Sequence, residues 1–177
     1  MSGAPRVLLV GMMGSGKTTI GHLLARRLGW RHVDSDAQVE VATGRSVAQI
    51  FAEDGEAAFR VEEARALAEA VTSPDPVVVS VAGGAVLDAD NRARMKGAGC
   101  VVWLRARPET LAGRVGSGAG RPLLEGDPAG NLARLDAVRR PHYEEVADHA
   151  VDVDDAAPDR IVDLIAGWCA PTGAERG

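Results

Sequence analysis

The sequence predicts a single α/β domain with a five-stranded parallel sheet flanked by helices. Five short runs of β-branched residues or leucine recur along its 177 residues, and longer segments with helical character separate them. Alternation of this kind is typical of a parallel sheet covered by helices on both faces. The apolar content of 46% is enough for one substantial core in a chain of this length. A glycine-rich turn follows the first run, at the edge where such sheets bind ligands.

The expected strands are residues 7–10, 32–34, 77–81, 100–104 and 150–153. After the first strand, apolar residues at helical spacing predict a helix that Gly29 ends, and Pro158 opens a similar helix near the carboxyl end. We expect both helices to pack on the sheet. Their apolar faces are Ile20, Leu23, Leu24 and Leu28 in the first, and Ile161, Leu164, Ile165 and Trp168 in the second.

Two segments are expected to cover a site rather than to form core. Residues 36–71 predict a helical insertion between the second and third strands. Residues 116–120 read GSGAG and lead into Arg121, which predicts a mobile lid with a charged tip over about residues 114–126. The domain is expected to span residues 1–170, with residues 171–177 as a flexible tail.

Charge and cysteine usage exclude several classes of protein. A formal net charge of −5 argues against nucleic-acid binding through a basic face, and no apolar run approaches the length that crosses a membrane. Cys100 and Cys169 have no pairing or metal-ligand spacing, so we expect neither a disulfide nor a zinc site. These features predict a cytoplasmic protein, and the lack of an interface signal predicts a monomer.

The stretch RVLLVGMMGSGKTT, residues 6–19, predicts a nucleotide site. Its Gly11, Gly16, Lys17 and Thr18 satisfy the pattern G-x-x-x-x-G-K-S/T between a predicted strand and a predicted helix. In such a loop, backbone N–H groups and the helix N-terminus hold phosphate oxygens. Lys17 would bridge the β- and γ-phosphates, and Thr18 would offer a hydroxyl to Mg²⁺.

A D-S-D triplet, residues 34–36, ends the second strand. Strand alternation would put Asp34 and Asp36 on one face, at the carboxyl edge of the sheet. The triplet is also compatible with a helix cap formed by Ser35 or Asp36. Beside a phosphate loop, the first interpretation makes Asp34 an outer partner of the Mg²⁺ water and directs Asp36 at the acceptor.

Five motifs in order give the chain a resemblance to the shikimate kinase family. They are D-S-D at 34–36, D-G-E-x-x-F-R at 54–60, G-G-A-V at 83–86, R-P-L-L at 121–124 and R-x-P-x-Y at 139–143. The resemblance runs from about residue 6 to residue 168. It implies a P-loop kinase fold and a magnesium-dependent transfer of the γ-phosphate of ATP to the 3-hydroxyl of shikimate, on the route to chorismate and the aromatic amino acids.

The resemblance also implies a role for each site residue and makes residues 36–71 the substrate-binding insertion. The catalytic residues would be Lys17, Asp36 and Arg121. ATP would be bound by Gly14, Ser15, Gly16, Lys17, Thr18, Thr19, Arg114, Arg121 and Pro158, with Arg114 stacking on the adenine. Shikimate would be bound by Asp36, Arg60, Gly83, Gly84 and Arg139, where the motif register selects Arg139 over Arg140. The metal ligands would be Thr18 and Asp34.

Several points stay open at the level of sequence. Asp36 would act either as a base or as an orienter of the hydroxyl. Glu63 either holds Arg60 in place or, as the simpler reading, forms a plain surface pair with it. Ala82 stands where the family usually has glycine, which costs about 1 kcal/mol if the position needs a positive φ and nothing otherwise. Rival functions are a gluconate or nucleoside monophosphate kinase and a nucleotide-binding regulatory protein without turnover.

Overall fold

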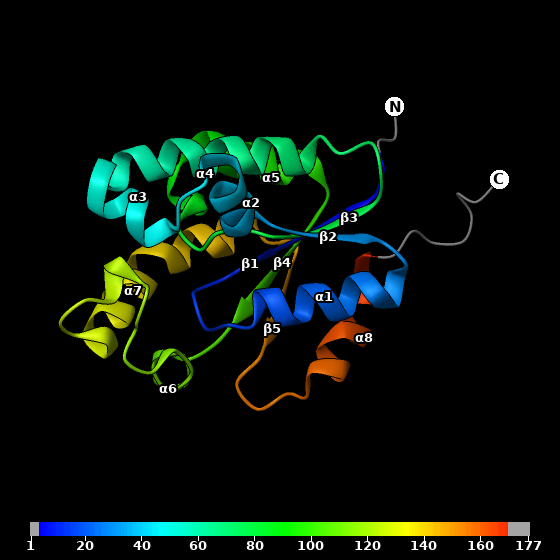
Figure 1. The fold of residues 1–177 in the computed structure, drawn as a ribbon. Helices are drawn as coiled ribbons and strands as arrows, with labels where there is room; N and C mark the ends of the chain where they lie inside the picture. Colours follow the sequence, from blue (N-terminus) through cyan, green and yellow to red (C-terminus); the bar gives the residue numbers. More distant parts are fainter. Residues whose placement is uncertain (1–3, 170–177) are drawn as a thin grey trace.

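A five-stranded parallel sheet forms the centre of the molecule, with strand order β2-β3-β1-β4-β5 (Figure 1). The computed structural model describes residues 4–169. The strands are β1 Arg6–Val10, β2 Arg31–Asp34, β3 Val77–Ser80, β4 Cys100–Arg105 and β5 His149–Asp152. All four pairings are parallel, so every strand ends at the same edge of the sheet. The predicted α/β architecture is therefore confirmed, with strand boundaries shifted by at most one residue.

The central strands read as continuous apolar runs because helices cover both faces of the sheet. In β1, Val7, Leu8 and Leu9 are fully buried, and the three valines of β3 are as well. Helices α1 (Lys17–Leu28) and α8 (Pro158–Cys169) lie together on one face (Figure 1). Helices α4 (Glu56–Val71), α5 (Ala89–Ala98) and α7 (Pro128–Val146) cover the other.

Three helices occupy the segment between β2 and β3. They are α2 (Ser35–Thr43), α3 (Val47–Asp54) and α4. A small apolar cluster of Val39, Ile50, Phe59 and Ala66 joins them, separate from the main core. Ser46 begins α3 with a capping box, in which its hydroxyl accepts from the N–H of Gln49. The segment is thus a subassembly with its own core at the carboxyl edge of the sheet.

The segment between β4 and β5 carries the predicted lid. It contains α6 (Pro108–Val115), the short 3₁₀ helix η2 (Pro122–Leu124) and α7. A second 3₁₀ helix, η1 (Ala85–Leu87), follows β3. Gly116, Gly118 and Gly120 all have positive φ, which supplies the tight turns between α6 and η2.

The two helices on the α1 face begin and end near the predicted positions. Gly29 caps α1 in the left-handed conformation, and Pro158 is the first residue of α8. The predicted apolar face of α8 is only partly correct, because Leu164 and Trp168 are 40% and 38% exposed whereas Val162 is buried. Trp168 nevertheless contacts the sheet, because its ring stacks on that of His149 in β5 with centroids 4.7 Å apart.

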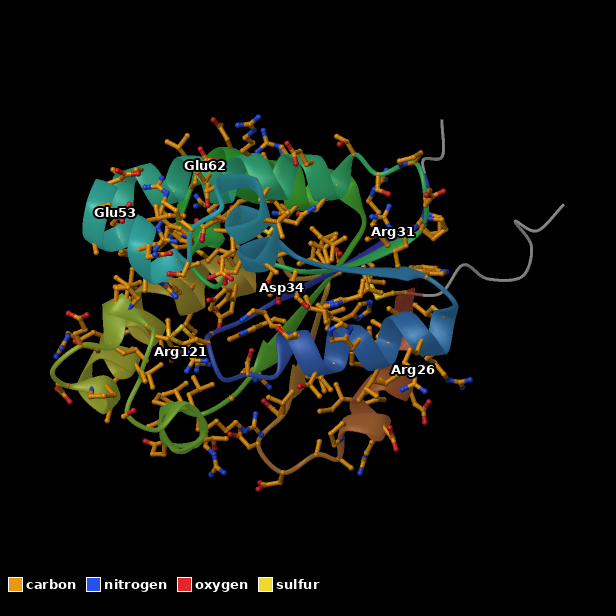
Figure 2. All side chains as sticks on the ribbon, in the orientation of Figure 1. Arg26, Arg31, Asp34, Glu53, Glu62 and Arg121 are labelled. Carbon is orange, nitrogen blue, oxygen red and sulfur yellow. A yellow bond between two sulfur atoms is a disulfide. The ribbon has the colours of Figure 1, made fainter. Side chains whose placement is uncertain are left out.

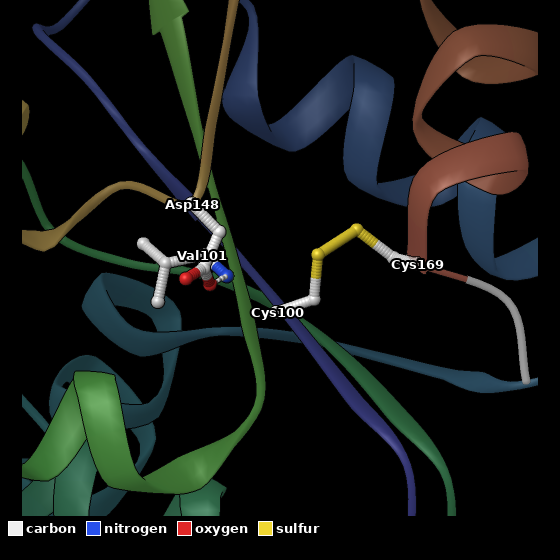
Figure 3. The surroundings of a disulfide bond; sticks show 4 residues. All are labelled: Cys100, Val101, Asp148 and Cys169. Carbon is white, nitrogen blue, oxygen red and sulfur yellow. Dashed lines mark hydrogen bonds between the residues drawn. A yellow bond between two sulfur atoms is a disulfide. The ribbon is translucent and has the colours of Figure 1, made fainter.

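A disulfide joins Cys100 to Cys169, which corrects the expectation that neither cysteine is paired (Figure 3). Cys100 is the first residue of β4 and Cys169 the last of α8, and their Cα atoms lie 5.8 Å apart. In a parallel α/β fold, helices return to the edge where strands begin, so these two ends meet there. The two cysteines are 69 residues apart in the sequence, so no local spacing indicates that they are in contact.

Two further expectations concern the limits of the chain and the membrane. The predicted tail, residues 171–177, lies outside the described residues. Within residues 4–169, none of the helices combines the length and the apolar character that spanning a bilayer requires.

Candidate active site

A cavity of about 470 Å³ opens at the carboxyl edge of the sheet. Asp34, at the end of β2, and Arg121, in the lid segment, lie at this edge, whereas Arg26 and Arg31 lie at the opposite one (Figure 2). The cavity brings together most of the sequence-predicted site residues. Those that line it are Gly14, Gly16, Lys17, Thr18, Thr19, Asp34, Asp36, Arg60, Gly83, Gly84, Arg121 and Arg139.

The phosphate loop connects β1 to α1 in the conformation that the glycines permit. Gly16 precedes α1 with φ of 94°, and a Cβ at Gly11 would lie 2.7 Å from the carbonyl oxygen of Leu104. Lys17 Nζ donates to the carbonyl oxygens of Gly11 and Met12, at 2.9 and 3.0 Å. An ammonium group has three donors, so one N–H is left for an oxygen outside the loop. Burial lowers the pKa of Lys17 to about 8, against the opposing effect of Asp36 and Asp34.

Thr18 and Asp34 place two oxygen groups side by side next to this loop. The hydroxyl of Thr18 donates to Asp34 Oδ2 at 2.7 Å. A hydroxyl and a carboxylate are ligands that suit Mg²⁺, which is bound in such sites through one or two protein oxygens plus phosphates and water. Among the described residues there is no group of three or more His, Cys, Asp or Glu side chains placed to hold a metal ion. The residues present thus fit a metal that is shared with a nucleotide.

The D-S-D triplet does not follow strand alternation, which corrects the expectation for this motif. Strand β2 ends at Asp34, and Ser35 and Asp36 are already in α2. Asp34 is the cap of α2, where its Oδ1 accepts from the N–H groups of Asp36 and Ala37 at 3.1 and 3.3 Å. The cap is therefore Asp34 rather than Ser35 or Asp36. The same carboxylate serves Thr18 through its other oxygen.

Asp36 nevertheless faces the cavity. Burial raises the pKa of its carboxyl group, the charge of Asp34 acts in the same direction, and Lys17 and Arg60 oppose both. A carboxylate with a raised pKa is a stronger proton acceptor than an exposed one. Asp36 thus lies within the electrostatic reach of both the phosphate loop and Arg60.

Arg60 is held by two glutamates on its own helix. Its Nη1 donates to Glu63 Oε1 at 2.8 Å and its Nη2 to Glu56 Oε1 at 2.9 Å. Glu63 is 2% exposed, so the simpler reading of a surface pair is wrong. Burial raises the pKa of Glu63 to about 7, while the guanidinium of Arg60 acts in the opposite direction. Glu63 is thus a buried carboxyl group that orients the guanidinium at the cavity.

Arg139 and Arg140 have different surroundings, although they are neighbours in the sequence. Arg139 is 2% exposed and lines the cavity, and its Nε has no hydrogen-bond partner among the described residues. Arg140 instead pairs with Asp136 at 2.9 Å and lies over the ring of Trp103 at 5.2 Å. A buried guanidinium whose fork is not paired with a carboxylate is suited to binding an anion. Only Arg139 of the two can do this within the cavity.

The loop after β3 approaches both arginines closely. A Cβ at Gly84 would overlap the guanidinium of Arg60, and one at Gly83 would lie 3.2 Å from Arg139 Nη1. Ala82 is not strained, because no non-glycine residue among the described ones has a positive φ. Its N–H donates to the hydroxyl of Ser35 at 2.8 Å. The alanine at this position therefore carries no backbone strain.

Three sequence-predicted ATP residues lie outside the cavity lining. Ser15 is 2% exposed within the phosphate loop. Arg114 is exposed, and its guanidinium donates to the carbonyl oxygens of Gly14 at 3.2 Å and Val153 at 2.7 Å. Pro158 is exposed at the start of α8. Arg114 thus connects the phosphate loop to the segment that leads from β5 to α8.

Sequence reasoning assigned no site role to several groups that line the cavity. Phe51 and Phe59 pack with ring centroids 5.0 Å apart and form an apolar wall. The remaining unassigned lining residues include Met13, Glu40, Val47 and Ser80. Phe59 and Met13 lie within or beside recognised motifs, which could have indicated that they line the cavity. Glu40 and Val47 come from α2 and α3, and their place in the cavity depends on how those helices pack.

Comparison with known proteins agrees with this geometry. The family model described as shikimate kinase matches residues 13–170. The chain belongs to the shikimate kinase family. Curated shikimate kinases from Symbiobacterium thermophilum and Thermobifida fusca are 51% and 42% identical to it. The first alignment covers 80% of this chain and 82% of the relative, and the second covers 94% and 95%.

Comparison with solved structures leads to the same family. A shikimate kinase from Acinetobacter baumannii in complex with shikimate is similar with a TM-score of 0.88 and 36% identity, over 93% of this chain and 92% of the other. A gluconokinase from Sinorhizobium meliloti shares the fold alone, with a TM-score of 0.62 and 22% identity over 96% and 94% of the two chains. The protein is an α/β kinase of this family, and ATP is the family's co-substrate.

Proposed function

We propose that this cavity transfers the γ-phosphate of ATP to the 3-hydroxyl of shikimate, giving shikimate 3-phosphate and ADP. One observation carries the proposal: a phosphate loop and two arginines suited to a carboxylate, Arg60 and Arg139, line one cavity. Asp36 interacts electrostatically with both Lys17 and Arg60. Shikimate has one carboxylate and three hydroxyls, and so matches a site with cationic and anionic ends.

In this proposal the acceptor is bound through its carboxylate. Arg60 and Arg139 bind the acid, the Gly83–Gly84 segment offers backbone N–H groups, and Asp36 accepts from a ring hydroxyl. Each charge-assisted contact contributes about 1.5 to 3 kcal/mol. Two guanidinium groups on one carboxylate therefore select an acidic polyol over a neutral one. Asp36 either takes the hydroxyl proton or orients the hydroxyl.

Phosphoryl transfer requires positioning and charge stabilisation more than covalent chemistry. Lys17 and Arg121 stabilise the charge on the transferring group. Thr18 and Asp34 would hold Mg²⁺, which supplies further charge neutralisation at the phosphates. The other proposed ATP contacts are Gly14, Ser15, Gly16, Thr19, Arg114 and Pro158.

We further propose how the parts of the domain are used. Residues 36–71 bind the acceptor, and residues 114–126 close over the site, which excludes water and prevents ATP hydrolysis. Gly120, Arg121, Pro122 and Leu123 already line the cavity, which supports this use of the lid. We place the enzyme in the cytoplasm on the basis of its family alone. The two cysteines form a disulfide and so do not support a reducing compartment.

The test is ADP release by the purified protein with ATP and Mg²⁺. Acceptors are compared in parallel: none, shikimate, quinate, gluconate and a nucleoside monophosphate, each with and without a chelator. We expect turnover with shikimate that the chelator abolishes. Turnover with gluconate or a nucleotide instead would mean that Arg60 and Arg139 bind a different anion. ATP binding without turnover on any acceptor would favour a regulatory protein.

A further inference from the structure

Tyr143 is a buried group beside the cavity to which the proposed mechanism gives no role. It lies on α7 with no exposed surface, one helical turn after Arg139. Its hydroxyl donates to the carbonyl oxygen of Gly83 at 2.6 Å. Its ring stacks on Trp103 with centroids 5.8 Å apart. The ring alone would suffice for packing, so the hydroxyl group requires a separate explanation.

The phenol keeps its proton at any working pH. Burial raises the pKa of Tyr143 well above its usual range, although the nearby charge of Arg139 acts in the opposite direction. A protonated phenol has one donor, and here that donor is used on Gly83. Gly83 lies against both side chains, because a Cβ there would be 3.2 Å from Arg139 Nη1 and 3.6 Å from the phenol oxygen.

Holding the Gly83 carbonyl determines where the next amide points. The peptide bonds of the described chain are all trans, and in a trans peptide the C=O and the following N–H point in opposite directions. With the Gly83 carbonyl directed at Tyr143, the N–H of Gly84 is directed away from α7. Within residues 4–169 the N–H groups of Gly83 and Gly84 have no acceptor. Both glycines line the cavity.

We propose that Tyr143 is a positioning residue for the acceptor site. Its hydroxyl fixes the Gly83–Gly84 peptide between Arg60 and Arg139, so that the backbone donors and the two guanidinium groups present one preformed surface to a carboxylate. Glycine is the most flexible residue, and two in succession would otherwise sample many orientations. The inference rests on the proposed function, because it assigns the acceptor's carboxylate to this surface.

The first test is Tyr143→Phe, which removes the hydroxyl and keeps the ring. We expect the KM for shikimate to rise about tenfold, because the Gly83 carbonyl loses its buried donor and the peptide is released. The KM for ATP and kcat should change less than twofold. The Kd for shikimate without nucleotide, measured by calorimetry, should weaken by the same factor as the KM. An unchanged KM and Kd for shikimate would overturn the proposal.

Trp103→Phe is the matched control for packing. It disturbs the other face of the Tyr143 ring and leaves the hydroxyl in place. We expect a lower Tm with an unchanged KM for shikimate. If both variants alter Tm and neither alters KM, Tyr143 is only a packing residue.

Arg139→Ala separates this inference from the proposed function. If Arg139→Ala binds shikimate normally, the proposed acceptor site is wrong and the role of Tyr143 falls with it. If Arg139→Ala is impaired and Tyr143→Phe is not, only the role of Tyr143 is wrong. In the double variant Tyr143→Phe, Arg139→Ala, we expect the loss of shikimate binding free energy to be smaller than the sum of the two single losses, because both changes disrupt one surface.

A spectroscopic measurement works without any substitution. Tyr143 is the single tyrosine of the chain, so growth with 3-fluorotyrosine labels this position alone. We expect shikimate to shift the single ¹⁹F resonance and ADP alone to leave it in place. A resonance that saturating shikimate does not move would contradict the proposal, even if Tyr143→Phe fails to fold.

Discussion

At the scale of single residues, burial sets the charge state of the cavity. Glu63 is buried and Lys17 is half-buried, and desolvation is the largest influence on the pKa of each. Desolvation disfavours a charged group, so it lowers the pKa of the lysine and raises that of the glutamate. Both groups are thereby brought close to neutral pH, at about 8 and about 7. The site should therefore respond to pH over a narrow range.

The pKa of Lys17 predicts a loss of ATP binding in mild alkali. The proposed role of Lys17 requires its ammonium form, and in the free enzyme that form is lost as pH rises through about 8. Because kcat/KM reports the ionisation of free enzyme, we expect kcat/KM for ATP to fall about tenfold per pH unit above this value. Calorimetric binding of shikimate in the same buffers is the control. A flat profile to pH 9.5 would contradict the prediction.

The two adjacent arginines of α7 predict opposite outcomes for the same substitution. Arg139→Ala should lower kcat/KM for shikimate about 10- to 100-fold, because a buried charge-assisted contact is lost. Arg140→Ala should leave it within about twofold, since its partners are Asp136 and Trp103 outside the cavity. Steady-state kinetics with saturating ATP measures both. Equal losses would mean that the helix rather than the guanidinium is responsible.

From the raised pKa of Glu63 we predict that the free energy of unfolding decreases as pH rises. Between its ordinary value of 4.5 and about 7, the unfolded chain has released this proton and the folded protein retains it. The contribution of Glu63 to the free energy of unfolding is therefore complete below pH 4.5. It is lost as pH rises to 7, by an amount on the order of 3 kcal/mol. Urea unfolding should show that Glu63→Gln lacks this decline.

Glu62→Gln provides the matched control for Glu63. Glu62 precedes it on α4 and is partly exposed, so this variant should keep the wild-type dependence on pH. If Glu63→Gln and the wild type decline in parallel between pH 4.5 and 7, the carboxyl group is already ionised in the folded protein.

At the scale of elements, the junction of β2 and α2 assigns three roles to three successive residues. Asp34 caps α2 and accepts from Thr18, and Ser35 accepts from the N–H of Ala82. Asp36 faces the cavity. Where a strand turns into a helix, successive side chains leave the backbone in diverging directions, so one short motif reaches α1, the loop after β3 and the acceptor.

The disulfide between β4 and α8 predicts that a reductant lowers stability. Closing a loop of 69 residues stabilises the fold by about 4 kcal/mol through the entropy of the unfolded chain. We expect dithiothreitol to lower Tm by on the order of 10 °C and to release two thiols. The double variant Cys100→Ser, Cys169→Ser should have the lower Tm with or without dithiothreitol. Two titratable thiols in the oxidised protein would show that the bond does not form.

At the scale of the whole molecule, the parallel sheet gathers the site at one edge. Every strand ends at that edge, so the phosphate loop after β1, the triplet after β2 and the glycines after β3 become neighbours. The opposite edge carries the disulfide. Chemistry and covalent stabilisation are thus separated by the length of the sheet.

The surface of the molecule predicts a monomer. Within residues 4–169, the most exposed large apolar side chains are Val41, Val61 and Val138, each on a different helix, and scattered residues of this kind do not require a partner. We expect light scattering to give a mass near 18.4 kDa over the micromolar range. A mass of twice that value would contradict the expectation and would require a search for the interface.

The sequence alone determined the strands, the phosphate loop and the family. These features depend on local patterns: period-specific apolar runs, a loop whose glycines and lysine are consecutive, and motifs in order. It also selected Arg139 over Arg140 as the arginine to be placed in the cavity, because the motif register is itself local.

Only the tertiary structure decided the burial of Glu63, the bond from Tyr143 to Gly83 and the disulfide. Tyr143 and Gly83 are 60 residues apart, and the two cysteines 69. For Glu63, sequence spacing indicated a pair with Arg60 but not that other elements would cover it. Local propensity carries no information about which distant elements meet, because that depends on how helices and strands pack around one shared core.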